Sequence, residues 1–283
     1  MTERVTVRID GDGVADVRLN RPDKLNALDL ATFEALAGAG DRLAADPAVR
    51  AVVLSGEGRS FCAGLDFANF AAMAGERGDG AATGPSDRVR HLTADITARE
   101  PGRITNLGQQ AVHVWRELPQ PVIAAVAGHA LGGGLQIALG ADIRIVAPDA
   151  ELSVLEIRWG LVPDMTGTAA LVRLVGDDVA KELTFTGRTV GGEEAVRLGL
   201  ATRTAEDPRE AAMALARDIA GRSPDAIRAA KRLLNRATDG HDQAGQLLEE
   251  SRALGALRGT PNQAEAVRSY FEKRPPVFAD PQS

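Results

Sequence analysis

Apolar and polar residues alternate between Arg4 and Asn20, on both sides of a turn-forming stretch at Asp10–Gly13. This pattern is typical of a β-hairpin. A stretch with helical spacing of its apolar residues follows at Asp29–Ala45, and a continuous apolar run follows at Ala51–Ser55. The order strand, helix, strand predicts a crossover between parallel strands.

The same order recurs in the middle of the chain. The pattern predicts a helix at Ile104–Glu117, a strand at Val122–Val126, a helix that covers the glycine run as far as Leu139, and a strand at Asp142–Ala147. Beyond these elements it predicts helices at Thr168–Val175, Asp178–Thr184, Gly192–Leu198, Pro208–Ala220, Pro224–Asp239, His241–Leu257 and Pro261–Lys273. We therefore expect an α/β protein, with a core that carries the site at residues 1–205 and a helical C-terminal subdomain at residues 206–283.

Composition narrows the class of protein. The 283 residues carry a net charge of −6, so the chain has no overall basic field to attract nucleic acid or an anionic membrane. The single cysteine, Cys62, rules out an intrachain disulfide framework and a multi-cysteine metal site, and we expect no metal. Charged residues near the start and the lack of a long apolar run favour a cytoplasmic protein. Residues 74–87 are rich in glycine and small polar residues and predict a loop.

The glycine run at residues 128–134 follows a predicted strand and precedes helical spacing. Bare backbone N–H groups at a helix start can hold a negative charge. The run matches neither a Walker loop nor the dinucleotide fingerprint, and by itself it also suits a tight packing turn. A second loop at residues 55–66 follows another predicted parallel strand, and neighbouring parallel strands bring such loops together. Two N–H donors are therefore expected to converge.

Several motifs, in order along nearly the whole chain, resemble the enoyl-CoA hydratase/isomerase family, the crotonases. They are NRPDKLNAL (20–28), SFCAGLD (60–66), PVIAAVAGHALGGG (121–134), ELSVLEIRWGLVPDMTGT (151–168), FTGRTVGGEEAVRLGL (185–200) and FEKRPPVF (271–278). The resemblance implies a crotonase-like spiral of βαβ units with a helical C-terminal trimerisation region. It further implies a homotrimer or a dimer of trimers that acts on acyl-CoA thioesters of fatty acid metabolism. Coenzyme A would be part of the substrate, and no separate cofactor is expected.

The resemblance also implies roles for individual residues. The family's oxyanion hole, built from two backbone N–H groups, maps onto Leu65 and Gly133, within loops that contain Ala63, Gly64 and Gly132. Lys24 and Lys273 would lie near the adenine and phosphates of coenzyme A, the second from a neighbouring subunit, with an exposed surface lysine as the alternative for each. Asp66 would fix its loop. Preorganised N–H donors stabilise the enolate formed when a proton leaves the carbon beside a thioester carbonyl.

Three side chains would then decide the reaction. Hydratases of the family use two glutamates, and their positions are Gln136 and Glu156 in this chain. An amide can place a water molecule but cannot exchange a proton. A further acid, Asp164, gives a Glu/Asp pair that resembles the dienoyl-CoA isomerase branch, although that branch has an acid where Gln136 stands.

We therefore expect double-bond isomerisation of an enoyl- or dienoyl-CoA, with Glu156 and Asp164 as the acid–base pair. The alternatives are hydration of a 2-enoyl-CoA, with Glu156 as the carboxylate and Gln136 placing the water, and a catalytically quiet acyl-CoA-binding protein. At the level of single residues, Asp164 is alternatively an acid stabilised by the start of the next helix. Gln136 is alternatively a packing residue, and Cys62 is expected to be buried rather than nucleophilic.

Overall fold

The computed structural model describes residues 3–66, 99, 102–238, 240 and 243–281, and the loop expected at residues 74–87 lies outside this part of the chain. The strands are β1 (Val5–Ile9), β2 (Val14–Leu19), β3 (Ala51–Gly56), β4 (Val122–Val126), β5 (His129–Leu131), β6 (Ile143–Val146), β7 (Glu151–Ser153), β8 (Val190–Gly191) and β9 (Arg203–Thr204). The helices are α1 (Leu30–Ala45), α4 (Leu107–Glu117), α5 (Gly133–Gly140), α6 (Gly167–Val175), α7 (Asp177–Thr186), α8 (Gly192–Leu198), α9 (Pro208–Ala220), α10 (Pro224–Thr238), α11 (Gln243–Leu257) and α12 (Pro261–Glu272), with short 3₁₀ helices η1 (Pro22–Lys24) and η2 (Leu155–Trp159).

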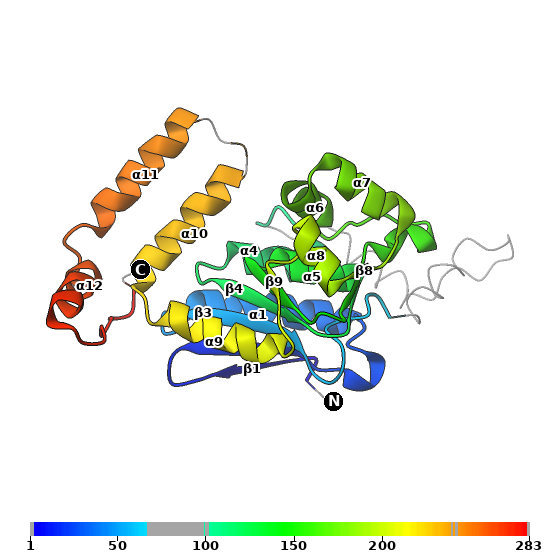
Figure 1. Cartoon of the computed structure of the whole chain (residues 1–283), viewed down its shortest axis with the longest axis horizontal. Coiled ribbons are helices and arrows are strands. Elements are labelled where there is room, and N and C mark those ends of the chain that lie inside the picture. The colour runs from blue at the N-terminus through cyan, green and yellow to red at the C-terminus, as the bar shows by residue number, and fades with distance from the viewer. Residues whose placement is uncertain (1–2, 67–98, 100–101, 239, 241–242, 282–283) are drawn as a thin grey trace, which may run out of the picture.

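A sheet in the order β1-β2-β3-β4-β6-β9 forms the centre of the described body (Figure 1). β1 and β2 are antiparallel, with Val7 opposite Val17, and each later pair of neighbours is parallel. The predicted hairpin and both predicted parallel crossovers are confirmed. Because β3 and β4 are neighbours, the loops that follow them leave the sheet at the same edge.

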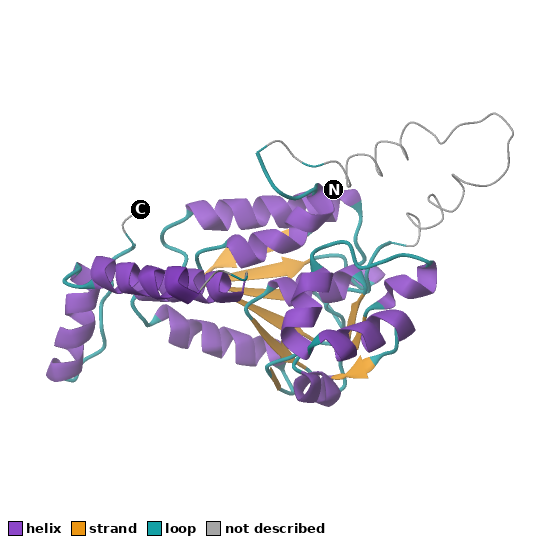
Figure 2. Ribbon diagram, turned by 90° about the horizontal axis from the view of Figure 1, so that it is seen from above, coloured by secondary structure: helices purple, strands orange, loops and turns teal. Residues whose placement is uncertain are grey.

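Different helices cover the two faces of this sheet (Figure 2). Val52 and Leu54 of β3 belong to the larger core, which includes Trp115 of α4. Val53 lies between them in the sequence, points to the opposite face and packs in a second core with Ala212 of α9. Apolar side chains on both faces explain why β3 reads as a continuous apolar run rather than an alternating one.

The glycine run differs from its prediction. The helix expected to cover it begins only at Gly133, because His129–Leu131 form β5, which pairs with β7 in a small second sheet. β7, β8 and β9 were not predicted, since strands of two or three residues are too short to show a period of two. The extra strand holds the glycines against the loop that follows β3.

The C-terminal residues divide between the body and an arm. α9 packs on the sheet, whereas α10, α11 and α12 extend away from it (Figure 1). The expected division between residues 205 and 206 stays a prediction. Within the segment 206–283, the helix nearest that division shares the core of the body, and the three helices after it form the arm.

Lys231 of α10 joins the arm to the body. Its buried ammonium group donates to the carbonyl oxygens of Trp115 and Gln120, each at 3.0 Å, and pairs with Asp142 Oδ2 at 2.8 Å. Burial lowers the pKa of Lys231, while the charge of Asp142 acts in the opposite sense. The Trp115 carbonyl belongs to the last turn of α4, where a positive charge is favourable.

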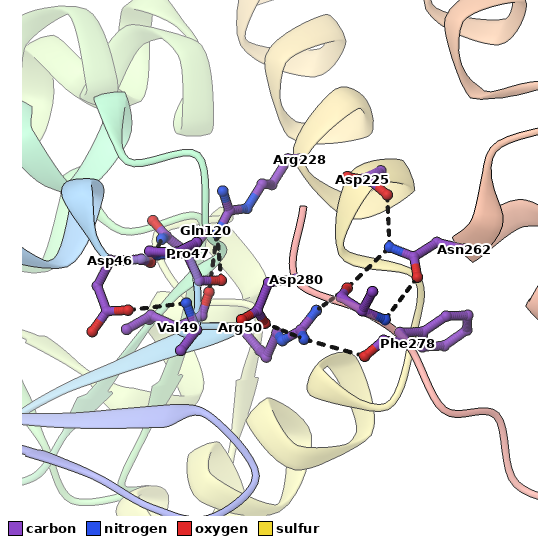
Figure 3. A network of polar contacts seen from close by, with 12 residues as sticks. Asp46, Pro47, Val49, Arg50, Gln120, Asp225, Arg228, Asn262, Phe278 and Asp280 are labelled. Atoms are coloured by element: carbon purple, nitrogen blue, oxygen red, sulfur yellow. Dashed lines mark hydrogen bonds and ion pairs between the residues drawn. The ribbon is translucent and has the colours of Figure 1, made fainter. Parts of the chain in front are cut away.

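A second group of contacts ties the C-terminal tail to the start of β3 and to the arm (Figure 3). Arg50 Nη2 donates to Asp280 Oδ1 at 2.6 Å. The Asn262 side chain donates to Asp225 Oδ2 at 2.7 Å and exchanges two hydrogen bonds with the backbone of Ala279, at 3.0 and 2.9 Å. A cavity of about 850 Å³ lies between arm and body beside these contacts. The predicted site residues do not line it.

Candidate active site

The loop after β3 and the glycine run after β4 are joined by backbone hydrogen bonds. Cys62 N–H donates to the His129 carbonyl at 2.8 Å, and Leu131 N–H donates to the Cys62 carbonyl at 3.0 Å. The approach is also close at Gly64, where a Cβ atom would lie 2.7 Å from the Leu131 carbonyl oxygen and 4.0 Å from the Gly133 nitrogen. The expected convergence of the two loops is therefore present.

Two backbone N–H groups lie at this junction. Among the described residues, the N–H groups of Leu65 and Gly133 have no hydrogen-bond acceptor. Gly133 is the first residue of α5, where the helix dipole favours negative charge. Gly64 has φ +92° and Gly132 has φ +53°, conformations that favour glycine. The assigned roles of Leu65 and Gly133 as an oxyanion hole stay a prediction.

Residues of the first motif hold the Leu65 loop in place. Leu28 N–H donates to the Gly64 carbonyl at 2.8 Å, and Ala63 N–H donates to the Leu25 carbonyl at 2.9 Å. Arg21 Nη2 donates to Asp66 Oδ2 at 3.0 Å, so Asp66 is an anchor of the loop in this structure. The loop is therefore fixed from outside the sheet.

Sequence reasoning missed two residues of this framework. Arg21 anchors Asp66, and the buried Asn26 donates to the carbonyl oxygens of Glu57 at 3.0 Å and Ser60 at 2.8 Å. Both lie inside the NRPDKLNAL motif. An asparagine between two predicted elements is a known signal for a left-handed turn, and Asn26 indeed has φ +57°.

A side-chain contact also links the two loops. Ser60 Oγ and His129 Nδ1 are hydrogen-bonded at 2.9 Å, and His129 Nε2 lies 3.5 Å from Glu151 Oε2. The Cys62 thiol next to Ser60 is buried and donates to the Asn26 carbonyl at 3.1 Å. Burial raises the pKa of Cys62 to about 12, so the thiol stays protonated, in agreement with its expected packing role.

Glu156 and Gln136 are brought together beside the glycine run. Gln136 Nε2 donates to Glu156 Oε1 at 2.6 Å, and the carboxyl group lies over Gly132, whose Cβ position is 3.4 Å from Oε1. The other oxygen, Glu156 Oε2, is buried and has no hydrogen-bond partner among the described residues. Burial raises the pKa of Glu156, and the negative charge of Asp164 adds to the rise.

Asp164 is exposed and lies three residues before α6. Surrounding protein raises the pKa of its carboxyl group by desolvation. A backbone hydrogen bond acts in the opposite sense and lowers this pKa. Glu156 and Asp164 are thus two carboxyl groups with raised pKa values, and the charge of Asp164 acts on Glu156. Raised pKa values of this kind are common at catalytic sites.

The two predicted coenzyme A contacts lie apart from this pair. Lys24 is exposed on η1, in the motif that supports the Leu65 loop. Lys273 is exposed directly after α12, which is part of the arm (Figure 1). One chain does not bring Lys273 to Glu156, and both lysine assignments stay predictions.

The described residues contain neither a metal cluster nor a membrane-spanning helix. Within the described ranges, no three histidine, cysteine or acidic side chains cluster in a way that could hold a metal ion. Of the helices in that same part of the chain, none combines the length and apolar character that crossing a membrane requires.

The close approach at Gly64 can be tested by adding one methyl group. Gly64→Ala is expected to lower the free energy of unfolding by about 1–3 kcal/mol, because the new Cβ meets the Leu131 oxygen and φ is positive. Chemical denaturation measures the change. Gly11→Ala is the matched control, since that position has open space around it and should change stability little. An unchanged stability in Gly64→Ala would show that the loops do not meet as described.

Comparison with known proteins adds independent findings. A family model described as enoyl-CoA hydratase/isomerase matches residues 14–277. A short-chain-enoyl-CoA hydratase of Clostridium acetobutylicum is 34% identical over 265 residues, which cover 92% of this chain and 92% of that protein. A Thermus thermophilus protein that is named as an enoyl-CoA hydratase is 36% identical over 279 residues. These residues cover 96% of this chain and 100% of that protein.

Solved structures are similar over the same extent. The crystal structure of an enoyl-CoA hydratase from Bacillus anthracis is 31% identical with a TM-score of 0.84, and covers 98% of this chain and 100% of that one. An enoyl-CoA hydratase from Mycobacterium smegmatis is 29% identical with a TM-score of 0.79, and covers 98% and 99% of the two chains. Both likenesses extend over the body and the arm.

Proposed function

The chain belongs to the enoyl-CoA hydratase/isomerase family, with the expected crotonase-like fold, and from this premise we propose that it isomerises a double bond in the acyl group of a CoA thioester. Membership of the family makes the chain an acyl-CoA enzyme. The choice of isomerisation over hydration, and the residues that carry it, are the proposal.

The proposed step moves a proton between two carbons. One carboxylate takes a proton from the carbon beside the thioester carbonyl, and the electrons of the C–H bond form an enolate whose charge lies on the carbonyl oxygen. The N–H groups of Leu65 and Gly133 donate to that oxygen. A carboxyl group then returns a proton to a different carbon, and the electrons move back from oxygen, so no atom is gained or lost.

The observation that carries this proposal is the state of the Glu156 carboxyl group. Its Oε2 is buried without a partner among the described residues, and the charge of Asp164 contributes to its raised pKa. A raised pKa makes the ionised carboxylate a stronger base, which suits a group that takes a proton and returns it. Asp164 supplies a second carboxyl for the other end of the transfer.

Hydration of a 2-enoyl-CoA is the second candidate, and the names of the relatives favour it. It needs Glu156 to activate a water molecule and Gln136 to place it. The Gln136 carbonyl oxygen already accepts the N–H groups of Met165 at 2.8 Å and Gly167 at 3.0 Å, so only its amide nitrogen is left to contact water. A quiet acyl-CoA-binding protein is the third candidate, and the retained acid pair argues against it.

Asp164→Asn separates the first two candidates. Purified protein is given a 2-enoyl-CoA and a 3,5-dienoyl-CoA, and the conjugated absorbance is followed. We expect Asp164→Asn to slow isomerisation by roughly 10²–10⁴-fold, because an amide cannot carry the proton, while any hydration through Glu156 persists. Asp178→Asn, at an exposed position of α7, is the control.

Each outcome of this experiment favours a different candidate. Isomerisation that is unchanged in Asp164→Asn would make the two-acid mechanism wrong. Tight binding of CoA esters without turnover, and without deuterium uptake at the acyl chain in D₂O, would favour the quiet binder. The trimeric assembly and the contacts of Lys24 and Lys273 with coenzyme A are further proposals that rest on the family alone. A cytoplasmic location is a further proposal that rests on the charged start of the sequence and its lack of a long apolar run.

A further inference from the structure

The buried side chain of Gln136 is held at both ends of its amide. Its Oε1 accepts the backbone N–H groups of Met165 at 2.8 Å and Gly167 at 3.0 Å, and its Nε2 donates to Glu156 Oε1 at 2.6 Å. Turning the amide over would set its NH₂ group against two N–H donors, so only one orientation is compatible with these bonds. That orientation makes Gln136 a hydrogen-bond donor toward Glu156.

The backbone that Gln136 holds is in an unfavourable conformation. Thr166 lies between the two N–H groups and has φ +69°, a left-handed value that β-branched residues rarely adopt. Its neighbour Gly167 is packed so closely that a Cβ there would lie 2.6 Å from Gln136 Oε1. The turn at residues 165–167 therefore depends on the Gln136 carbonyl, which both flanking N–H groups share.

This turn begins next to Asp164. We propose that Gln136 is a positioning residue for both carboxyl groups, holding the 165–167 turn that sets Asp164 and anchoring Glu156 by Oε1 so that Oε2 exchanges the proton. This inference rests on the proposed proton transfer by the two acids. This role differs from placing a water molecule, because the oxygen and the nitrogen of the Gln136 amide both form hydrogen bonds with groups of the protein.

The two functions of the amide can be separated by substitution. Gln136→Met keeps the approximate length of the side chain and removes both the acceptor and the donor. Gln136→Glu keeps an acceptor for the two backbone N–H groups, removes the donor and places a second carboxyl beside Glu156. Thr166→Gly removes the penalty for the left-handed turn and leaves Gln136 in place.

Turnover is measured as deuterium uptake at the acyl chain of a CoA thioester in D₂O. We expect Gln136→Met to lower kcat by roughly 10²-fold with little change in KM, since misplaced acids slow the chemistry without weakening binding of coenzyme A. Adding Thr166→Gly to Gln136→Met should recover part of the rate, because glycine adopts the turn without the carbonyl clamp. The recovery should exceed the effect of Thr166→Gly alone.

The dependence of the exchange rate on pH tests whether the side chain at position 136 acts on Glu156. In Gln136→Glu the limb of the pH profile that reports the ionisation of Glu156 should move to higher pH, because a neighbouring carboxylate disfavours that ionisation. An unmoved limb would show that the side chain at position 136 does not act on the Glu156 carboxyl group. If Gln136→Met retains wild-type kcat and Gln136→Glu retains the wild-type pH profile, the positioning role is wrong.

A measurement that needs no substrate tests the role of Gln136 independently of the proposed reaction. Hydrogen exchange of the Met165 and Gly167 amides should be slow in the wild type and in Gln136→Glu, and faster in Gln136→Met. Fast exchange in the wild type would overturn the clamp. A protein that shows the protected amides but no turnover with any acyl-CoA would instead overturn the proposed function. Circular dichroism establishes that each variant is folded.

Discussion

Replacing Glu156 by glutamine is expected to slow proton exchange at the acyl chain by roughly 10²–10⁴-fold and to stabilise the folded protein at neutral pH. The loss of rate follows because the amide has no proton to take or give. Its shape is nearly that of the carboxyl group, and its oxygen can still accept the N–H of Gln136. Deuterium uptake and the absorbance of a dienoyl-CoA both measure the rate.

The gain in stability follows from the raised pKa of Glu156, which comes from burial and secondarily from Asp164. Between the pKa of the unfolded chain, about 4.3, and the higher pKa of the folded state, the folded protein binds more protons. Its free energy of unfolding therefore falls as pH rises through this window. Glutamine avoids that loss, so the variant should be more stable above the window, by about 0.5–2 kcal/mol, and the difference should vanish near pH 4.

Denaturation curves at pH 4 and pH 8 measure this difference. Glu34→Gln, at an exposed position of α1, should alter neither activity nor the pH dependence. A Glu156→Gln protein that is less stable than the wild type at pH 8 would mean that the carboxylate is stabilised in the site. In that case the buried Oε2 atom of Glu156 would not destabilise the folded protein.

Removal of the Lys231 ammonium group is expected to have the largest effect on stability. Lys231→Met should lower the free energy of unfolding by about 3–5 kcal/mol, because one partner of a buried ion pair is lost. The carboxylate of Asp142 and the carbonyl oxygens of Trp115 and Gln120 then lose a shared donor. Chemical denaturation, followed by far-UV circular dichroism, measures the change.

An exposed lysine provides the comparison. Lys181 pairs with Asp177 at 2.6 Å on the surface of α7, and Lys181→Met should cost at most about 0.5 kcal/mol. Limited proteolysis adds a local test. If α10 detaches in Lys231→Met, cleavage should concentrate in the arm before the body unfolds. Equal costs for the two lysines would show that Lys231 does not hold the arm to the body.

The periodic parts of the fold could be predicted from the sequence because they bury a regular face. α8 and α9 begin and end at the predicted residues, and β4 does so as well. β5 could not be predicted, since its three residues pair with another three-residue strand, β7, which is distant in the sequence. Glycines permit strand and helix equally, so the pairing of β5 with β7 determined that residues 129–131 form a strand.

One contact between the candidate site residues could be predicted, but not the bonds that hold them. The family resemblance implied that Gln136, Glu156 and Asp164 share a site, and the first two are in contact. It did not indicate that the Gln136 carbonyl would hold the backbone at residues 165–167, because a hydrogen bond to a backbone N–H leaves no mark on residue type. Arg21 was missed for a related reason: its partner Asp66 is remote in the sequence.

The two donors proposed to stabilise the enolate, Leu65 N–H and Gly133 N–H, belong to the main chain. Most single amino-acid exchanges leave a main-chain N–H in place, whereas any exchange at position 136, 156 or 164 alters an acid, a base or their anchor. Random mutations would therefore alter the step that follows enolate formation more often than they would abolish enolate formation itself. On this basis, paralogues of the chain should share a thioester-binding centre and diverge in product.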